Sequence, residues 1–168
     1  RTLTGTADLV SKSATLVTSS ATSVFAYDTL TPAGTIKAIA LSNNMTAPAA
    51  GTANLRFLNL SPTSAVLSAV LTRTADGFGV ATTGSTTFGN VAYVGSTTPN
   101  EATLSNFTNI PVGTYTLVYA SGTTPVLSTT ITIREGKAYS LVARGYAAGR
   151  PGTTTAQALG ASLIMHNP

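Results

Sequence analysis

The chain is built from short runs in which apolar and hydroxyl side chains alternate, and turn residues separate these runs. In residues 113–120, Tyr115, Leu117 and Tyr119 alternate with polar or small neighbours. Alternation with a period of two places one set of side chains on one face of a β-strand. No stretch of eleven or more residues keeps the apolar spacing of an amphipathic helix. The pattern therefore predicts an all-β fold.

Turn signals divide the chain into many short strands. Extended segments are expected at about 3–10, 14–26, 35–42, 53–60, 65–73, 86–94, 102–108, 113–120, 125–133, 138–146 and 158–166. Asp76-Gly77 and Glu135-Gly136 are typical turn formers between such segments. Segments 113–120, 125–133 and 138–146 are expected to form a three-stranded meander. Together they predict an immunoglobulin-like antiparallel β-sandwich with an extended N-terminal strand arm.

Composition narrows the classes of function. Only 8% of residues are charged, whereas 32 threonines and 16 serines supply polar surface. Without cysteine, disulfides and thiolate metal sites are excluded. The nine lysines and arginines are spread along the chain, which argues against nucleic-acid binding. No apolar run is long enough to span a bilayer. Because the sequence begins at Arg1, we expect a mature, processed product.

Catalytic and metal-binding residues are scarce. The titratable candidates are Asp8, Asp28, Asp76, Glu101, Glu135 and His166. The acids are widely separated, and the single histidine lies near the end of the sequence, where an ordered catalytic base is not expected. One histidine and scattered acids do not form the ligand set of a metal site. We therefore expect no enzymatic activity, no metal and no cofactor.

The N-terminal part differs from the rest. Residues 1–30 are interpreted as an extended arm and a candidate donor strand, and residues 31–168 as a single β-sandwich domain. The arm carries apolar side chains that need a groove, and we assign it an assembly role through Leu9, Val10, Leu16, Val17, Val24 and Phe25. Two alternatives stay open: the segment forms two edge strands of its own sandwich, or it is a linker.

Surface chemistry leaves further options. Asn44, in the sequon Asn44-Met45-Thr46, is the best candidate for glycosylation. Tyr115, Tyr119 and Tyr139 are expected to pack in the core. A carbohydrate site would instead need the other three tyrosines on one face, namely Tyr27, Tyr93 and Tyr146.

Four segments of the second part of the chain form a recognisable set: LRFLNLSP at 55–62, FGNVAY at 88–93, IPVGTYTL at 110–117 and EGKAYSLVARG at 135–145. Through these segments, from about residue 53 to residue 166, the sequence resembles the domain of unknown function 4397 family of secreted prokaryotic β-sandwich modules. It implies a β-sandwich and an extracellular address, and it implies no reaction. The first 50 residues are expected to lie outside the family pattern.

Two functions fit these observations. The first is a structural subunit of an extracellular filament or surface assembly, a homopolymer whose copies join by β-strand donation. The second is a secreted or cell-surface module for adhesion or carbohydrate binding. A periplasmic lipoprotein domain is a third possibility.

Overall fold

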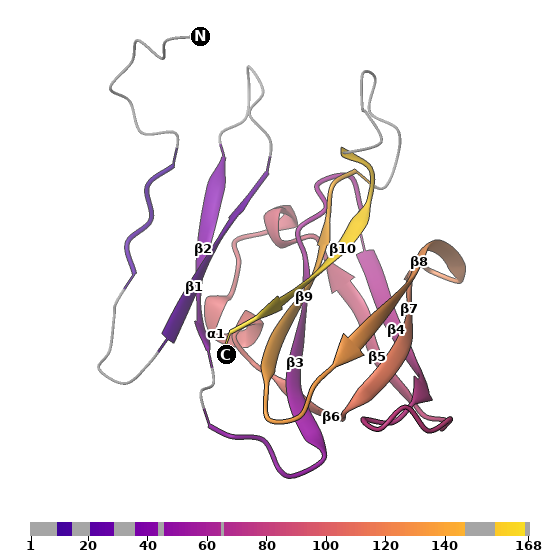
Figure 1. The fold of residues 1–168 in the computed structure, drawn as a ribbon. Helices are drawn as coiled ribbons and strands as arrows, with labels where there is room; N and C mark the ends of the chain where they lie inside the picture. The colour runs from indigo at the N-terminus through magenta and orange to yellow at the C-terminus, as the bar shows by residue number, and fades with distance from the viewer. Residues whose placement is uncertain are drawn as a thin grey trace, which may run out of the picture.

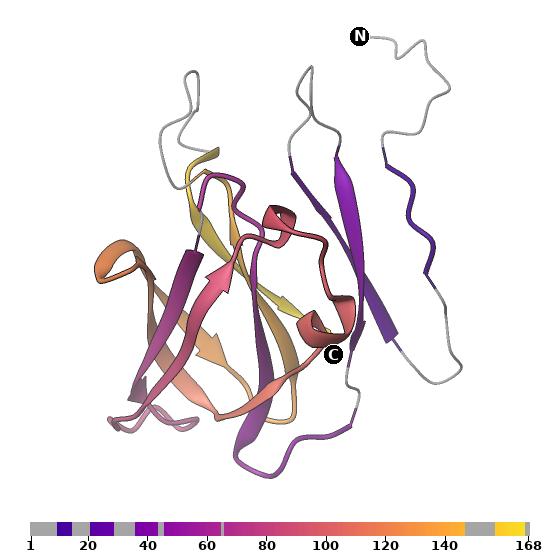
Figure 2. The ribbon, with the colours of Figure 1, turned by 180° about the vertical axis from the view of Figure 1, so that it is seen from behind.

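A computed structural model of the chain describes residues 10–14, 21–28, 36–43, 46–64, 66–146 and 157–166. Strands dominate these residues (Figures 1 and 2). They are β1 (Ala21–Tyr27), β2 (Lys37–Asn43), β3 (Thr52–Asn59), β4 (Val66–Ala75), β5 (Ser85–Ala92), β6 (Thr108–Pro111), β7 (Gly113–Ser121), β8 (Thr124–Ile133), β9 (Ala138–Arg144) and β10 (Gly160–Met165). A 3-10 turn, η1 (Val94–Ser96), and a short helix, α1 (Glu101–Leu104), join β5 to β6. The all-β class is confirmed.

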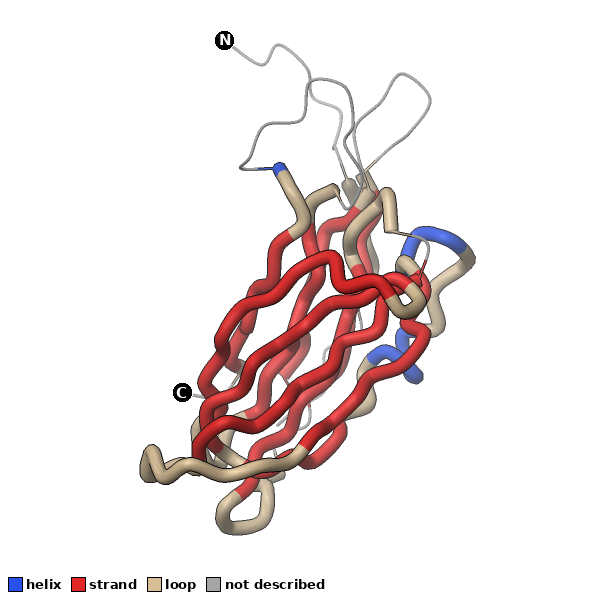
Figure 3. The backbone as a smooth tube through the Cα atoms, turned by 90° about the vertical axis from the view of Figure 1, so that its right-hand side faces the viewer, coloured by secondary structure: helices blue, strands red, loops and turns tan. Residues whose placement is uncertain are grey.

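Two four-stranded sheets form the sandwich. The middle sheet has the order β10-β9-β3-β6 and the back sheet the order β5-β4-β7-β8. Leu55 of β3, Leu71 of β4, Leu117 of β7 and Leu141 of β9 lie in the core between them, each fully buried. Tyr119 stacks on Phe57 in the same core, with ring centroids 5.3 Å apart. The strands run between two ends at which most loops gather (Figure 3).

A third layer covers the other face of the middle sheet. β1 and β2 form their own two-stranded antiparallel sheet, with Val24 opposite Ala40 and Phe25 opposite Ile39. Figure 1 shows this β1–β2 pair beside the middle sheet, on the side away from the back sheet. β3 is consequently buried on both faces along nearly its whole length. The pairing of β1 with β2 crosses the predicted domain boundary at residue 30.

One prediction about strand arrangement, the three-stranded meander, was wrong. β7 and β8 pair as expected, but β9 does not continue the meander; it lies in the middle sheet between β3 and β10. β9 is buried on both faces. The middle sheet is the layer that is covered on both faces, so a strand of this kind belongs there. The pairing of β3 with β9 is also parallel, whereas every other strand pair described is antiparallel.

The predicted strand at 102–108 was also wrong. Residues 101–104 form α1, and β6 begins only at Thr108. The Asn100 side chain accepts a hydrogen bond from the backbone N–H of Thr103 at 3.1 Å. This N-cap satisfies a free donor of the first helical turn and favours the helix over an extended backbone.

Candidate assembly interface

The face between the β1–β2 pair and the middle sheet is centred on a buried arginine. Arg56 lies in the middle of β3, and only 2% of its surface is exposed. Alternation along β3 directs Leu55 and Phe57 into the sandwich core, so Arg56 and Leu58 point toward the β1–β2 pair. Among the residues that the structure describes, no carboxylate forms an ion pair with Arg56. Burial lowers the pKa of Arg56 to about 10, which leaves it charged at neutral pH.

Neutral hydrogen-bond acceptors and aromatic rings surround this charge. Nε donates to Ser140 Oγ of β9 at 2.6 Å. Nη1 donates to the carbonyl oxygen of Ser42 at 2.9 Å, and Nη2 donates to Asn43 Oδ1 at 2.8 Å. The guanidinium carbon also lies 4.7 Å from the ring centroid of Phe107 and 5.8 Å from that of Phe25. These contacts replace the water that the cation loses on burial.

The polar contacts close into a ring that ties five segments of the chain together. Asn43 Nδ2 donates to Ser23 Oγ at 2.9 Å, and Ser23 Oγ lies 3.1 Å from His166 Nδ1. His166 Nε2 lies 2.7 Å from Ser140 Oγ, which returns to Arg56. The ring therefore joins β1, β2, β3, β9 and the residue after β10. We call Arg56, Ser140, His166, Ser23 and Asn43 the Arg56 ring.

The ring assigns a tautomer to His166. Ser140 Oγ accepts from Arg56, so its hydroxyl proton is free to donate to His166 Nε2. His166 Nδ1 then carries the proton and donates to Ser23 Oγ. Burial, together with a smaller effect from the charge of Arg56, lowers the pKa of His166 to about 4. His166 is therefore neutral at neutral pH and accepts one hydrogen bond while donating another.

Apolar side chains complete the interface on one side of the ring. Phe25 and Tyr27 of β1 and Ile39 and Leu41 of β2 pack with Leu58 of β3, Val142 of β9 and Val94 of η1. This cluster is smaller than the sandwich core. Among the described residues, β1 and β2 pair by main-chain ladder only with each other. Side chains are therefore the principal link between the β1–β2 pair and the sandwich.

The structure places part of the predicted assembly set. Phe25 is 9% exposed and lies in this cluster, whereas Val24 is 60% exposed on the opposite face of β1. Val10 is 39% exposed, at the rim of a neighbouring cavity. Leu9, Leu16 and Val17 lie outside the described residues, as does the glycosylation candidate Asn44.

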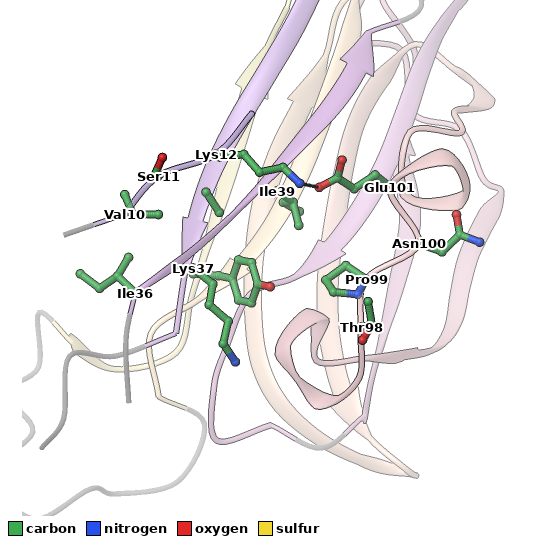
Figure 4. A pocket seen from close by; sticks show the side chains of 12 residues that line it. Val10, Ser11, Lys12, Ile36, Lys37, Ile39, Thr98, Pro99, Asn100 and Glu101 are labelled. Carbon is green, nitrogen blue, oxygen red and sulfur yellow. Dashed lines mark ion pairs between the residues drawn. The ribbon is translucent and has the colours of Figure 1, made fainter. Parts of the chain in front are cut away.

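An open cavity of about 1000 Å³ lies at the edge of the β1–β2 pair (Figure 4). Residues 10–12, residues 36–39, Tyr27 and the loop 98–101 line it. Lys12 Nζ reaches across to Glu101 Oε1 at 2.6 Å. Glu101 Oε1 also accepts from the backbone N–H of Ala40 at 3.3 Å. The cavity wall therefore connects residues 10–14 and α1 to β2.

The other carboxylates have structural partners too. Asp28 Oδ2 lies 3.1 Å from Lys37 Nζ, and Glu135 Oε1 accepts from the backbone N–H of Gly51 at 2.5 Å. Asp76 accepts from two backbone N–H groups of its own turn, and these bonds lower its pKa. In the part of the chain that the structure describes, no three histidine or acidic side chains gather as a metal site. Asp8 lies outside that part.

Three of the six tyrosines lie in the core, as expected, and the other three lie near one another outside it. Tyr115, Tyr119 and Tyr139 are 1%, 0% and 4% exposed. Tyr27 packs edge-on against Tyr93, with centroids 6.4 Å apart. Tyr27 also lines, with Tyr146, a cavity of about 340 Å³ between β1 and the β9–β10 end. Burial raises the pKa of Tyr93 to about 12, with Asp28 contributing in the same direction.

Sequence reasoning missed Arg56 and dismissed His166. Arg56 was one cation among nine, and the position of His166 in the sequence counted against an ordered role. One signal was present: β3 reads as an apolar run in which residues of both parities are large and apolar, LRFL at 55–58. A strand with two apolar faces needs a cover on both, which indicates a third layer.

Comparison with known families supports the resemblance. Residues 1–70 match the family described as Domain of unknown function (DUF4397). The expectation that the first 50 residues lie outside the family pattern was wrong, because the match includes β1, β2 and β3. No curated protein matches the chain. None of the helices in the described residues is both long and apolar enough to cross a membrane.

Proposed function

We propose that the chain is a structural subunit of an extracellular filament or surface assembly, and that copies join when β1 of one copy takes its place beside β2 of the next. The observation that carries the proposal is that β1 and β2 form a two-stranded sheet of their own, which side chains rather than a main-chain ladder join to the sandwich. Among the residues that the structure describes, β1 is held by one ladder to β2, by Phe25 and Tyr27, and by Ser23 in the Arg56 ring. A second copy of β1 presents the same groups, so the same contacts form between chains.

The chemistry of the interface suits exchange. When β1 leaves, Ile39 and Leu41 lose their cover, and Ser23 leaves hydrogen-bond partners unpaired. Without β1, buried hydrogen-bonding groups stay unpaired, and this costs free energy. A strand of the same shape and polarity, such as β1 of another copy, removes that cost. No reaction is part of this proposal, since the described carboxylates have structural roles.

Two adjacent residues of β1 provide a test with a matched control. Phe25→Asp places a charge in the buried cluster and is expected to abolish assemblies seen by electron microscopy and size-exclusion chromatography. Val24→Asp adds the same charge on the exposed face of the same strand and is expected to leave the fold and β1 pairing intact. Assemblies that survive Phe25→Asp, or native material that is monomeric throughout, would contradict the proposal.

A binding module is the second candidate, favoured by the cavity that Tyr27 and Tyr146 share. Tyrosine rings offer an apolar surface for stacking against a sugar. A soluble glycan panel followed by NMR would detect it, through shifts confined to residues around Tyr146. The same shifts in a Tyr146→Ala variant would remove this candidate.

A further inference from the structure

An almost fully exposed aromatic side chain lies at one end of the sandwich, and the cavity that Tyr27 and Tyr146 share lies at the other end. Phe78 is 96% exposed, and Val80, two residues later, is 63% exposed. Both lie in the loop that connects β4 to β5, at the lower end of Figure 1. Phe78 borders a cavity that the core residues Val112 and Ile133 also line, but its ring stays almost fully exposed. Its position therefore adds little to the stability of the fold and calls for another explanation.

The loop holds Phe78 in a fixed position. Asp76 Oδ1 accepts from the backbone N–H groups of Phe78 and Val80, both at 2.9 Å. The backbone N–H of Asp76 donates to the Val80 carbonyl at 2.9 Å, and Ala75 bridges to Ala81. An acidic side chain that accepts from two backbone amides of the same turn fixes that turn. The aromatic ring is therefore presented on a preorganised support.

A hole of suitable size lies at the opposite end of the strands. It has a volume of about 340 Å³. Its apolar lining includes Tyr27, Leu60, Pro62, Val142, Tyr146 and Ile164, and the polar side chains of Asp28, Arg144 and Ser162 complete the wall. Leu60 follows the end of β3, and β4 runs from there toward Asp76, which places Phe78 and the hole at opposite ends. A cavity of about 150 Å³ already accepts benzene in a protein, so this hole can receive a phenyl ring.

We propose that Phe78 of one copy inserts into this hole of a second copy, so that copies associate head to tail. Phe78, which we call the plug, and the hole are different surfaces of the molecule. A contact between two different surfaces leaves one of each free on every pair of copies, so it does not close on itself. Repetition therefore extends a row of molecules. The contact goes beyond the exchange of β1. Tyr27 of β1 lines the hole, but the hole is already formed when β1 pairs with β2 of its own chain, so the contact does not require exchange.

The test uses two full-length variants and their mixture. Phe78→Glu removes the plug and keeps the hole, whereas Ile164→Glu fills the hole with a charge and keeps the plug. Both positions are exposed, so both variants are expected to fold. Sedimentation velocity over a concentration series should show self-association of the natural chain and an affinity at least about 30-fold weaker in each variant, from the apolar area withdrawn.

The mixture gives the decisive result. One intact plug and one intact hole remain between the two variants, so an equimolar mixture should form one-to-one dimers and nothing larger. Val126→Glu, at a 37% exposed position of β8, is the matched control and should associate like the natural chain.

Three outcomes overturn the proposal. The first is a natural chain that stays monomeric at every concentration. The second is loss of association in Phe78→Glu but not in Ile164→Glu, which indicates a different contact for Phe78. The third is Phe78-dependent binding to phosphatidylcholine vesicles without self-association, which assigns the loop to a lipid surface. Plug contacts reverse on dilution, whereas exchanged β1 strands persist, so the two kinds of contact are distinguishable.

Discussion

The two faces of the middle sheet are buried in different ways. Toward the back sheet, leucines, alanines and aromatic rings pack in a continuous apolar core. Toward the β1–β2 pair, a charged arginine, two serines, an asparagine and a histidine form a closed ring beside a smaller apolar cluster. Apolar burial is non-directional and tolerates small shifts. The ring is directional and is satisfied only by a strand with matching side chains, which is what the strand exchange that we propose would need.

The largest expected effect comes from the apolar side. Leu117→Ala removes a fully buried side chain and is expected to cost about 2–5 kcal/mol of unfolding free energy, from lost burial plus the cavity. Because the core unites both sheets, the loss should appear in the whole molecule, measured by chemical denaturation. A loss confined to β1 and β2 would reverse the roles that we assign to the two faces.

Arg56→Ala should destabilise only the interface between the middle sheet and the β1–β2 pair. It leaves Ser140, Asn43 and the Ser42 carbonyl without their donor, at a cost of about 3 kcal/mol. Native-state hydrogen exchange should show roughly 100-fold faster exchange in β1 and β2, with β4 and β7 nearly unchanged. Arg56→Met refills part of the volume with apolar atoms and should recover some protection. Equal losses in all strands would contradict the comparison.

His166 gives the polar side a pH dependence. Its pKa is about 4 in the folded chain and about 6.5 when unfolded, so the unfolded state binds the proton first as the pH falls. The stability contribution is therefore full above about pH 6.5 and is lost toward pH 4, by roughly 1–2 kcal/mol after allowance for solvent screening. His166→Gln should remove this part of the pH profile in denaturation experiments. Identical profiles for the natural chain and the variant would contradict a His166 whose pKa is lowered by folding.

The smallest expected change in stability concerns tyrosine hydroxyls in the sandwich core. Tyr119 is fully buried, its hydroxyl has no hydrogen-bond partner in the described part of the chain, and burial raises its pKa. Tyr119→Phe removes that unpaired group and should leave stability unchanged or raise it by about 1 kcal/mol. Tyr115 donates to the Pro111 carbonyl at 2.6 Å, so Tyr115→Phe should lower stability by about 1 kcal/mol. Thermal melts of the pair test the difference in sign.

The same contrast explains what could be predicted from the sequence. Alternation in 113–120 and 125–133 marked β7 and β8 to within a residue or so, because a half-buried strand shows its two faces in sequence. The position of β9 could not be predicted, because a strand buried on both faces shows no alternation and its partner is distant in the chain. The Arg56 ring could not be predicted either, since its members come from five separate segments.

Placement of the N-terminal residues was predictable only in part. Phe25 was identified as a side chain that needs a groove, and the structure buries it. The groove lies on the same chain, formed by Leu58 and Val142 together with β2. Apolar spacing gives the need for a groove but not which copy supplies it, because the same contacts satisfy the strand within or between chains.

Cross-linking of β1 to β2 tests the central claim most directly. Thr22 and Ser42 face each other across the ladder, and the chain has no cysteine of its own. Thr22→Cys and Ser42→Cys chains, mixed under assembling conditions and oxidised, should yield a disulfide between two chains. Thr129→Cys, on β8, should not cross-link to Ser42→Cys. If the doubly substituted chain closes only on itself and the mixed single variants never cross-link, β1 stays with its own chain and strand exchange is wrong.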